Sequence, residues 1–258
     1  MKRCYSPISS NKLDPYRLSF EPKCKRFLNS SDQATCQELA ALIRPTMTID
    51  FEKEIFAILP FVRDDRTHSL IIYQDYCSLL PQPPFPIIKQ ILLHFHFYEY
   101  ALFKDTLYHL FSQSNIKRQY KIPCATSEYS LLPLTNATKK DTIWVNPGKI
   151  MTLSASGPQL FIELHNQFSF PCLVESRRLK QTMLISFLAH GIIKREHSYQ
   201  LPRANTSLTE FLELSFSPLT NHLLEDLHFH DLPGKRGSFS LIYQDLYAEE
   251  SQQKMRQK

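Results

Sequence analysis

Residues Tyr120–Val174 read YKIPCATSEYSLLPLTNATKKDTIWVNPGKIMTLSASGPQLFIELHNQFSFPCLV, and this stretch decides the class of fold. It divides into short runs rich in β-branched and aromatic residues, separated by proline, glycine, asparagine and serine, a pattern typical of strands joined by turns. A Pro-Gly pair at 147–148 favours a wider loop over a tight two-residue hairpin. The predicted strands are Tyr120–Ala125, Tyr129–Leu134, Thr142–Asn146, Lys149–Ser154, Gln159–Leu164 and Phe168–Val174.

Upstream of this stretch, three further runs are predicted to be strands. They are Met47–Phe51, Ile55–Leu59 and His68–Tyr76, and Pro60 is expected to close the second. A proline lacks the backbone N–H that a strand donates to its neighbour, so it usually marks a strand end.

Two long segments have the spacing of buried helices. One begins at Pro86, a residue suited to the first turn of a helix, and runs to about Gln113. The other covers Ser176–His190, with Ser176 as the predicted N-cap and Gly191 as the C-terminal glycine. The fold class is therefore predicted to be α+β, with a strand-rich antiparallel or mixed core and two main helices at about 86–113 and 176–190.

Weaker helical patterns lie near both ends of the chain. One short helix is expected to start at Ser31 or Asp32 and to end at Pro45. Two more fit Leu208–Leu214 and Leu219–Leu227, whereas Glu249–Lys258 is expected to be frayed. Together these patterns predict an N-terminal extension, partly flexible, at 1–45, a core at 46–200, and a C-terminal tail with short helices at 201–258.

The composition excludes several classes of protein. The chain has only 5 glycines in 258 residues and lacks the glycine-rich signatures of dinucleotide, P-loop and α/β-hydrolase sites. Its 6 cysteines show no C-x-x-C spacing, so reduced thiols in a cytoplasmic protein are expected. The most apolar window, Ile87–Phe111, contains charged residues and histidines and is not predicted to span a membrane. We expect no cofactor.

Positive charge is concentrated in the first 200 residues. Residues 1–45 carry a net charge of +4, residues 46–200 carry +3, and residues 201–258 carry −2. Three short basic clusters flank predicted strands or begin a helix, and if they converge they form a surface that contacts phosphate groups. Ordinary solvated charge is the alternative. The candidate DNA-binding residues are Lys117, Arg118, Lys121, Lys139, Lys140, Arg177, Arg178 and Lys180.

Two other classes of function stay open. The histidine pairs His94/His96 and His228/His230 suggest a small metal-dependent enzyme, but a helix would place His94 and His96 too far apart around its axis to share one ion. We therefore predict no metal site and no catalytic residues. The large apolar content and the weak net charge also fit a protein–protein interaction module without nucleic-acid binding.

Seven short motifs follow one another within residues 47–195. They are Ala57–Pro60, His68–Asp75, Lys121–Pro123, Leu131–Thr135, Ile143–Asn146 with Ile150, Ile162–Phe170, and Ser176–Leu188 with Gln181. In this order they resemble the competence transcription factor family of Gram-positive bacteria. The chain lacks the Gly-Arg turn that often precedes the family's Lys-x-Pro motif, and Leu134 separates the family's Pro-Thr pair. Residues 1–45 and the tail have no counterpart in the family pattern.

This resemblance implies an activator of DNA-uptake genes that reads double-stranded AT-rich DNA through phosphate and minor-groove contacts. It also implies a nucleoid-associated homo-oligomer whose DNA-binding core is residues 46–200, with contacts to RNA polymerase. Control by a proteolytic adaptor is implied too, and with it a regulatory role for the tail at 201–258. Trp144 and Tyr129 are expected to support the core instead of contacting a ligand. The basic clusters are compatible with such a target, because the narrow minor groove of AT tracts attracts lysine and arginine.

Overall fold

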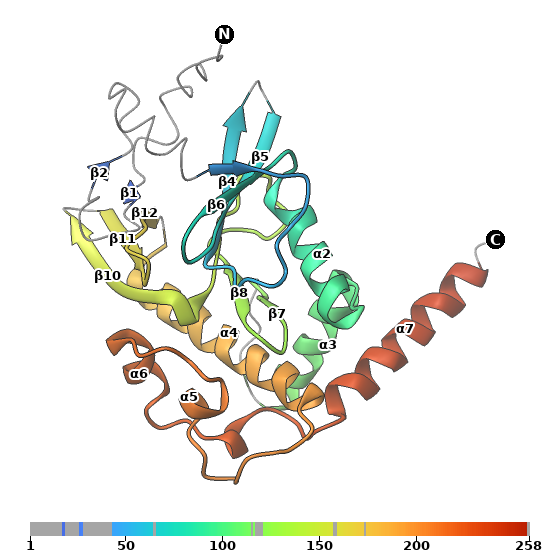
Figure 1. Ribbon diagram of the computed structural model, residues 1–258. Helices are drawn as coiled ribbons and strands as arrows, with labels where there is room; N and C mark the ends of the chain where they lie inside the picture. Colours follow the sequence, from blue (N-terminus) through green and yellow to red (C-terminus); the bar gives the residue numbers. More distant parts are fainter. Residues whose placement is uncertain are drawn as a thin grey trace.

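The computed structural model describes residues 17–18, 26–27, 43–63, 66–114, 116, 121–156, 159–172 and 174–256. Figure 1 shows sheets and helices packed together, with one long helix extending away from the body. The prediction of an α+β fold is confirmed. The predicted helix that ends at Pro45 falls mostly on residues outside this description, although Ile43–Pro45 itself is a strand.

The larger sheet has the strand order β3-β6-β5-β4-β9-β8-β7. It is antiparallel apart from the pair of β3 with β6. Consecutive residues of the central strands β4 and β5 are buried, so both faces of the larger sheet are covered at its centre. Its strands are β3 (Ile43–Pro45), β4 (Ala57–Arg63), β5 (Arg66–Ile72), β6 (Cys77–Leu80), β7 (Cys124–Ala125), β8 (Ser130–Pro133) and β9 (Trp144–Val145).

The smaller sheet is antiparallel and has the order β10-β11-β12-β1-β2. The 3-10 turn η1 (Pro147–Lys149) connects this sheet to β9 of the larger sheet. As predicted, Pro147 and Gly148 do not form a tight two-residue hairpin. The Asn146 side chain accepts a 2.9 Å hydrogen bond from the N–H of Gly148 and fixes this turn. The strands are β1 (Arg17–Leu18), β2 (Arg26–Phe27), β10 (Ile150–Ser156), β11 (Gln159–Leu164) and β12 (Ser169–Cys172).

Two strand predictions were wrong. Residues 46–56 form turns and extended backbone instead of the expected strand at Met47–Phe51. Pro60 lies inside β4 and does not close it. It is tolerated there because β9 pairs only with Ala57 and Ile58, so the side of β4 that faces β9 has no ladder at Pro60.

The predicted helix at 86–113 is two helices, α2 (Pro84–His96) and α3 (Tyr100–Gln113). Phe97 ends α2 in the left-handed conformation, with φ of 58°, and its N–H bonds to the carbonyl of Leu93. The chain therefore turns between the two helices without a glycine or proline. The apolar faces of both helices are buried in the core.

The second main helix, α4 (Ser176–His197), is longer than predicted and passes through Gly191. A Cβ at Gly191 would lie only 2.5 Å from Cδ2 of Leu232. Close packing, not helix termination, therefore explains this glycine. Figure 1 shows α4 running from the strands of the smaller sheet toward the base of α7.

The C-terminal segment packs against the rest of the chain. Leu208, Leu224, Leu232 and Phe239 belong to the same apolar cluster as the sheet strands. The expectation of a frayed end was wrong for residues up to 256, because α7 continues to Arg256. The elements are α5 (Leu208–Phe211), α6 (Pro218–Leu224), η2 (Phe229–Asp231) and α7 (Ser238–Arg256).

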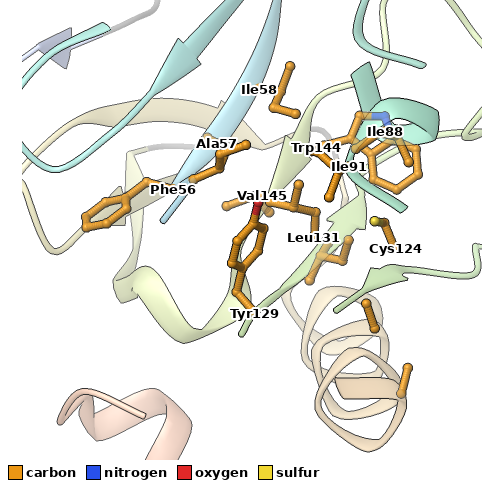
Figure 2. Close-up of a cluster of buried hydrophobic side chains, with 14 of the residues drawn as sticks. Phe56, Ala57, Ile58, Ile88, Ile91, Cys124, Tyr129, Leu131, Trp144 and Val145 are labelled. Atoms are coloured by element: carbon orange, nitrogen blue, oxygen red, sulfur yellow. The ribbon is translucent and has the colours of Figure 1, made fainter. Parts of the chain in front are cut away.

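The centre of the core lies between the larger sheet and the helices. Figure 2 shows Trp144 beside Ile88 and Ile91 of α2, and Tyr129 pointing toward Val145 and Ala57. Trp144 is fully buried and Tyr129 is 3% exposed, so the prediction that both support the core is confirmed. Of the helices described, none is long and apolar enough to cross a lipid bilayer.

Candidate nucleic-acid interface

Lys121 lies at the meeting point of two of the predicted basic clusters. Its side chain is half-buried, and its Nζ donates a 2.5 Å hydrogen bond to the carbonyl oxygen of Leu134, the residue that follows β8. Burial lowers the pKa of Lys121; the Cys172 thiol opposes this shift, and the positive charge of Arg178 adds to it. The ammonium group is thus fixed beside the first turns of α4.

The loop between β8 and β9 holds Lys139 and Lys140 in a compact turn. The N–H of Leu134 bonds to the carbonyl of Ile143 at 2.9 Å and closes the base of this loop. Inside the loop, the N–H of Lys139 bonds to the carbonyl of Asn136 at 3.1 Å. The N–H of Thr142 bonds to the carbonyl of Lys139 at 3.2 Å. Both lysine side chains are exposed. A structured loop therefore directs two ammonium groups into solvent.

Arg177, Arg178 and Lys180 lie in the first turns of α4. The N-cap is Glu175, not Ser176 as predicted, and its side chain makes no capping hydrogen bond. Cations at a helix N-terminus oppose the helix dipole, so the helix itself gains nothing from these three residues. A negative charge bound from outside would compensate them and make this placement favourable.

The acidic residues next to these cations in the sequence, Asp141 and Glu175, are both exposed to solvent. Arg178 Nε lies 3.4 Å from a carboxylate oxygen of Glu175, but both side chains are about three-quarters exposed, so solvent screens the pair strongly. In the same described region, Lys139, Lys140, Arg177 and Lys180 have no carboxylate within ion-pair distance. Their charge is available to an external anion.

The structure thus brings Lys121 and Arg178 together and attaches the loop of Lys139 and Lys140 to Lys121 through Leu134. Lys117 and Arg118 lie outside the described residues. We call the six described cations the basic end. They are Lys121, Lys139, Lys140, Arg177, Arg178 and Lys180.

Sequence reasoning did not identify the contact that connects these clusters. The hydrogen bond from Lys121 to Leu134 depends on the pairing of β8 with β9. One signal in the sequence pointed to it: Lys121 precedes an apolar run and has no acidic residue within the next six positions. A lysine in such a context is often fixed by a backbone carbonyl.

The histidine pairs do not form a metal centre. His94 stacks on Phe51 at 3.8 Å between ring centroids, and His96 stacks on His197 at 3.9 Å. His228 and His230 both lie beside Asp231 in η2. Within the described ranges, no group of three histidine, cysteine, aspartate or glutamate side chains could hold a metal ion. The three described cysteines, Cys77, Cys124 and Cys172, are free and buried.

Comparison of the chain with models of known families, with curated proteins and with solved structures finds no match.

Proposed function

We propose that this protein binds double-stranded DNA through the basic end. The observation that carries the proposal is the hydrogen bond from Lys121 to Leu134, which holds the Lys121 ammonium group at the root of the loop that contains Lys139 and Lys140. Among the described residues, Lys139, Lys140, Arg177 and Lys180 have no carboxylate within ion-pair distance, and Arg178 has only the exposed Glu175. We infer that these cations from separate parts of the sequence act together with Lys121 on one anion. Such a surface suits the regular array of phosphates along a duplex.

The finer part of the proposal is a transcriptional activator of DNA-uptake genes that reads AT-rich sites. It is supported by the resemblance to the competence transcription factor family. The basic end adds a physical reason, because arginine and lysine are attracted to the narrow minor groove of AT tracts. Under this proposal the protein is a regulator and not an enzyme.

The test is fluorescence anisotropy with an AT-rich duplex of about three helical turns, using wild type and Arg177→Glu/Arg178→Glu. Charge reversal should weaken binding about tenfold or more at moderate salt, and wild-type log affinity should fall linearly with log salt. A matched control is Lys235→Glu/Arg236→Glu, which reverses the same amount of charge. Lys235 and Arg236 are exposed and lie near the C-terminal turn of α4, where Arg195 bonds to residues 232–234.

Arg195 is roughly 25 Å along α4 from Arg178 at the helix rise of 1.5 Å per residue, and the control pair directly follows the residues to which Arg195 bonds. If both double variants lose affinity equally, only net charge matters and the basic end is not the contact surface. If wild type fails to bind any duplex at low salt, the proposal is wrong.

A second candidate is a protein–protein interaction module without nucleic-acid binding. One observation favours it: α7 extends from the body and exposes Leu241, Tyr247 and Met255. A stable stoichiometric complex with another protein, lost on substitution of these three residues and accompanied by no duplex binding, would support it.

A further inference from the structure

The outer edge of β10 is open along most of its length. β10 is the terminal strand of the smaller sheet and pairs only with β11 among the described strands. Figure 1 shows it at the margin of the molecule, with α6 near one end. In an antiparallel strand, every second residue directs its N–H and C=O away from its partner. These groups of β10 therefore form a hydrogen-bonding edge with which no strand of the described residues pairs.

The beginning of this edge is protected and the rest is not. Ser217 Oγ donates hydrogen bonds to the carbonyl oxygens of Ile150 at 2.8 Å and of Met151 at 3.3 Å, and the pairing with β11 is irregular between Ile150 and Thr152. Beyond that point, residues 152–156 read TLSAS and contain no charged residue and no proline. Proteins usually protect exposed edges with those residues.

The side chains of this segment are self-complementary about a two-fold axis. If two copies pair antiparallel with Ser154 opposite Ser154, then Leu153 of each copy lies opposite Ala155 of the other. A large residue then faces a small one twice on the apolar face, and two hydroxyl groups meet on the polar face. Ser154 and Ala155 are exposed, and Leu153 is half-buried against the core, so all three are already placed for this pairing.

We propose that β10 pairs with β10 of a second copy of this chain and joins the two smaller sheets across a two-fold axis. The absence of charge in residues 152–156 means that no like charges oppose one another. The symmetric pairing also covers both open edges and ends there, which gives a closed dimer. Because stable interfaces usually bury about 1,200–2,000 Å² and this ladder is only five residues long, the dimer should be weak and concentration-dependent.

The experiment is sedimentation velocity on the full chain over a wide range of concentrations, without nucleic acid. Wild type should shift from monomer to dimer as concentration rises. Ser154→Lys and Ser154→Glu each place like charges at the axis and should weaken the dimer at least tenfold. An equimolar mixture of the two variants should restore it as a heterodimer. Gln244→Lys and Gln244→Glu, at an exposed site on α7, serve as matched controls.

Circular dichroism and thermal unfolding check that the Ser154 variants fold like wild type, as expected for an exposed position. A wild-type chain that stays monomeric at the highest concentration reached overturns the proposal. So does a dimer that the single Ser154 substitutions leave unchanged, or one that the mixture fails to restore. Because no DNA is present, none of these outcomes depends on the proposed function.

Discussion

The backbone N–H of Ser127 donates a hydrogen bond of 2.9 Å to Nε2 of His96, which lies on a different element 31 residues earlier. The carbonyl of Ser127 is 3.3 Å from Nε2 of His190 on α4. These partners require a neutral His96 with an unprotonated Nε2 and a His190 that carries its proton on Nε2. Two imidazoles thus hold the turn between β7 and β8 to α2 and α4.

The first prediction is that acid destabilises the fold through these histidines. Burial lowers the pKa of His96 to about 3, with repulsion from His197 adding to the effect, and burial lowers the pKa of His190 to about 4. An unfolded histidine has a pKa of about 6.5. Each folded-state pKa is the lower one, so this stability is complete above pH 6.5 and is lost as pH falls toward 3–4. Each histidine contributes a slope of at most about 1.4 kcal/mol per pH unit.

Urea unfolding at pH values from 7.5 to 4.5 measures this slope. His96→Gln should reduce it, because a glutamine amide oxygen can still accept from Ser127 but does not titrate. His222→Gln is the control, since His222 is exposed at the surface of α6. An unchanged slope in His96→Gln would contradict the assignment.

The second prediction concerns Arg195, a buried residue near the end of α4. Its guanidinium donates to the carbonyls of Leu232 at 3.2 Å, Pro233 at 2.6 Å and Gly234 at 3.0 Å. Arg195→Met leaves these carbonyls without a donor and should lower the free energy of unfolding by about 2–4 kcal/mol.

Chemical denaturation checks this loss, with Arg203→Met at an exposed position as the control. Arg195→Lys keeps the charge but has only one nitrogen in place of the forked guanidinium, so it should recover only part of the stability. A loss below about 0.5 kcal/mol for Arg195→Met, the level of an ordinary surface substitution, would contradict the role of the three bonds.

The third prediction is that Phe239 anchors α7. Among the described residues of α7, Phe239 is the one that is buried. The centroid of its ring lies 5.2 Å from that of the Tyr98 ring and 5.6 Å from that of the Phe103 ring. Glu196 also holds the first turn by accepting hydrogen bonds from the N–H of Gly237 and from Ser240 Oγ, both at 2.9 Å. Phe239→Ala should release the helix while the sheets stay folded.

Hydrogen exchange measures this release. Amides of α7 should lose protection in Phe239→Ala, whereas those of β4 and β5 should keep it. Leu241→Ala, which removes a 64% exposed side chain from the same helix, should change neither. Equal loss of protection in all elements would mean that α7 is part of one cooperative unit with the core.

The sequence predicted best those elements whose side-chain pattern is local. Residues Gln159–Leu164 contain the apolar run Leu160–Ile162 with an aromatic and a β-branched residue, and they form β11 with the predicted bounds. The break between α2 and α3 could not be predicted, because Phe97 adopts a left-handed conformation that bulky residues rarely take. Tertiary packing explains it: Tyr98 of the connection packs against Phe239 and Tyr243 of α7, more than 140 residues later.

The candidate site was predictable as residue types but not as an arrangement. The basic clusters are visible in the sequence, yet the link between Lys121 and Leu134 depends on strand pairing. The nearness of Lys121 to Arg178 depends in turn on how α4 packs against β7 and β8, where Ser186 of the helix bonds to Ser130 of β8 at 3.0 Å. Such long-range contacts leave no periodic signal in the chain.

The fourth prediction separates the loop lysines from the rest of the basic end. Lys139 and Lys140 are exposed, and the loop is held by backbone bonds and by the side chains of Asn136 and Thr142. Lys139→Ala/Lys140→Ala should therefore leave thermal stability unchanged within about 0.5 kcal/mol. If both lysines contact phosphates, the slope of log affinity against log salt should become shallower by nearly 2, at about 0.9 per contact.

Anisotropy titrations at five or more salt concentrations give this slope. Lys139→Arg/Lys140→Arg keeps both charges and should retain the wild-type slope, which distinguishes charge from loop geometry. A slope that stays at the wild-type value in the alanine variant would remove the loop from the contact surface. The contact surface would then be restricted to Lys121 and to the first turns of α4, which carry Arg177, Arg178 and Lys180.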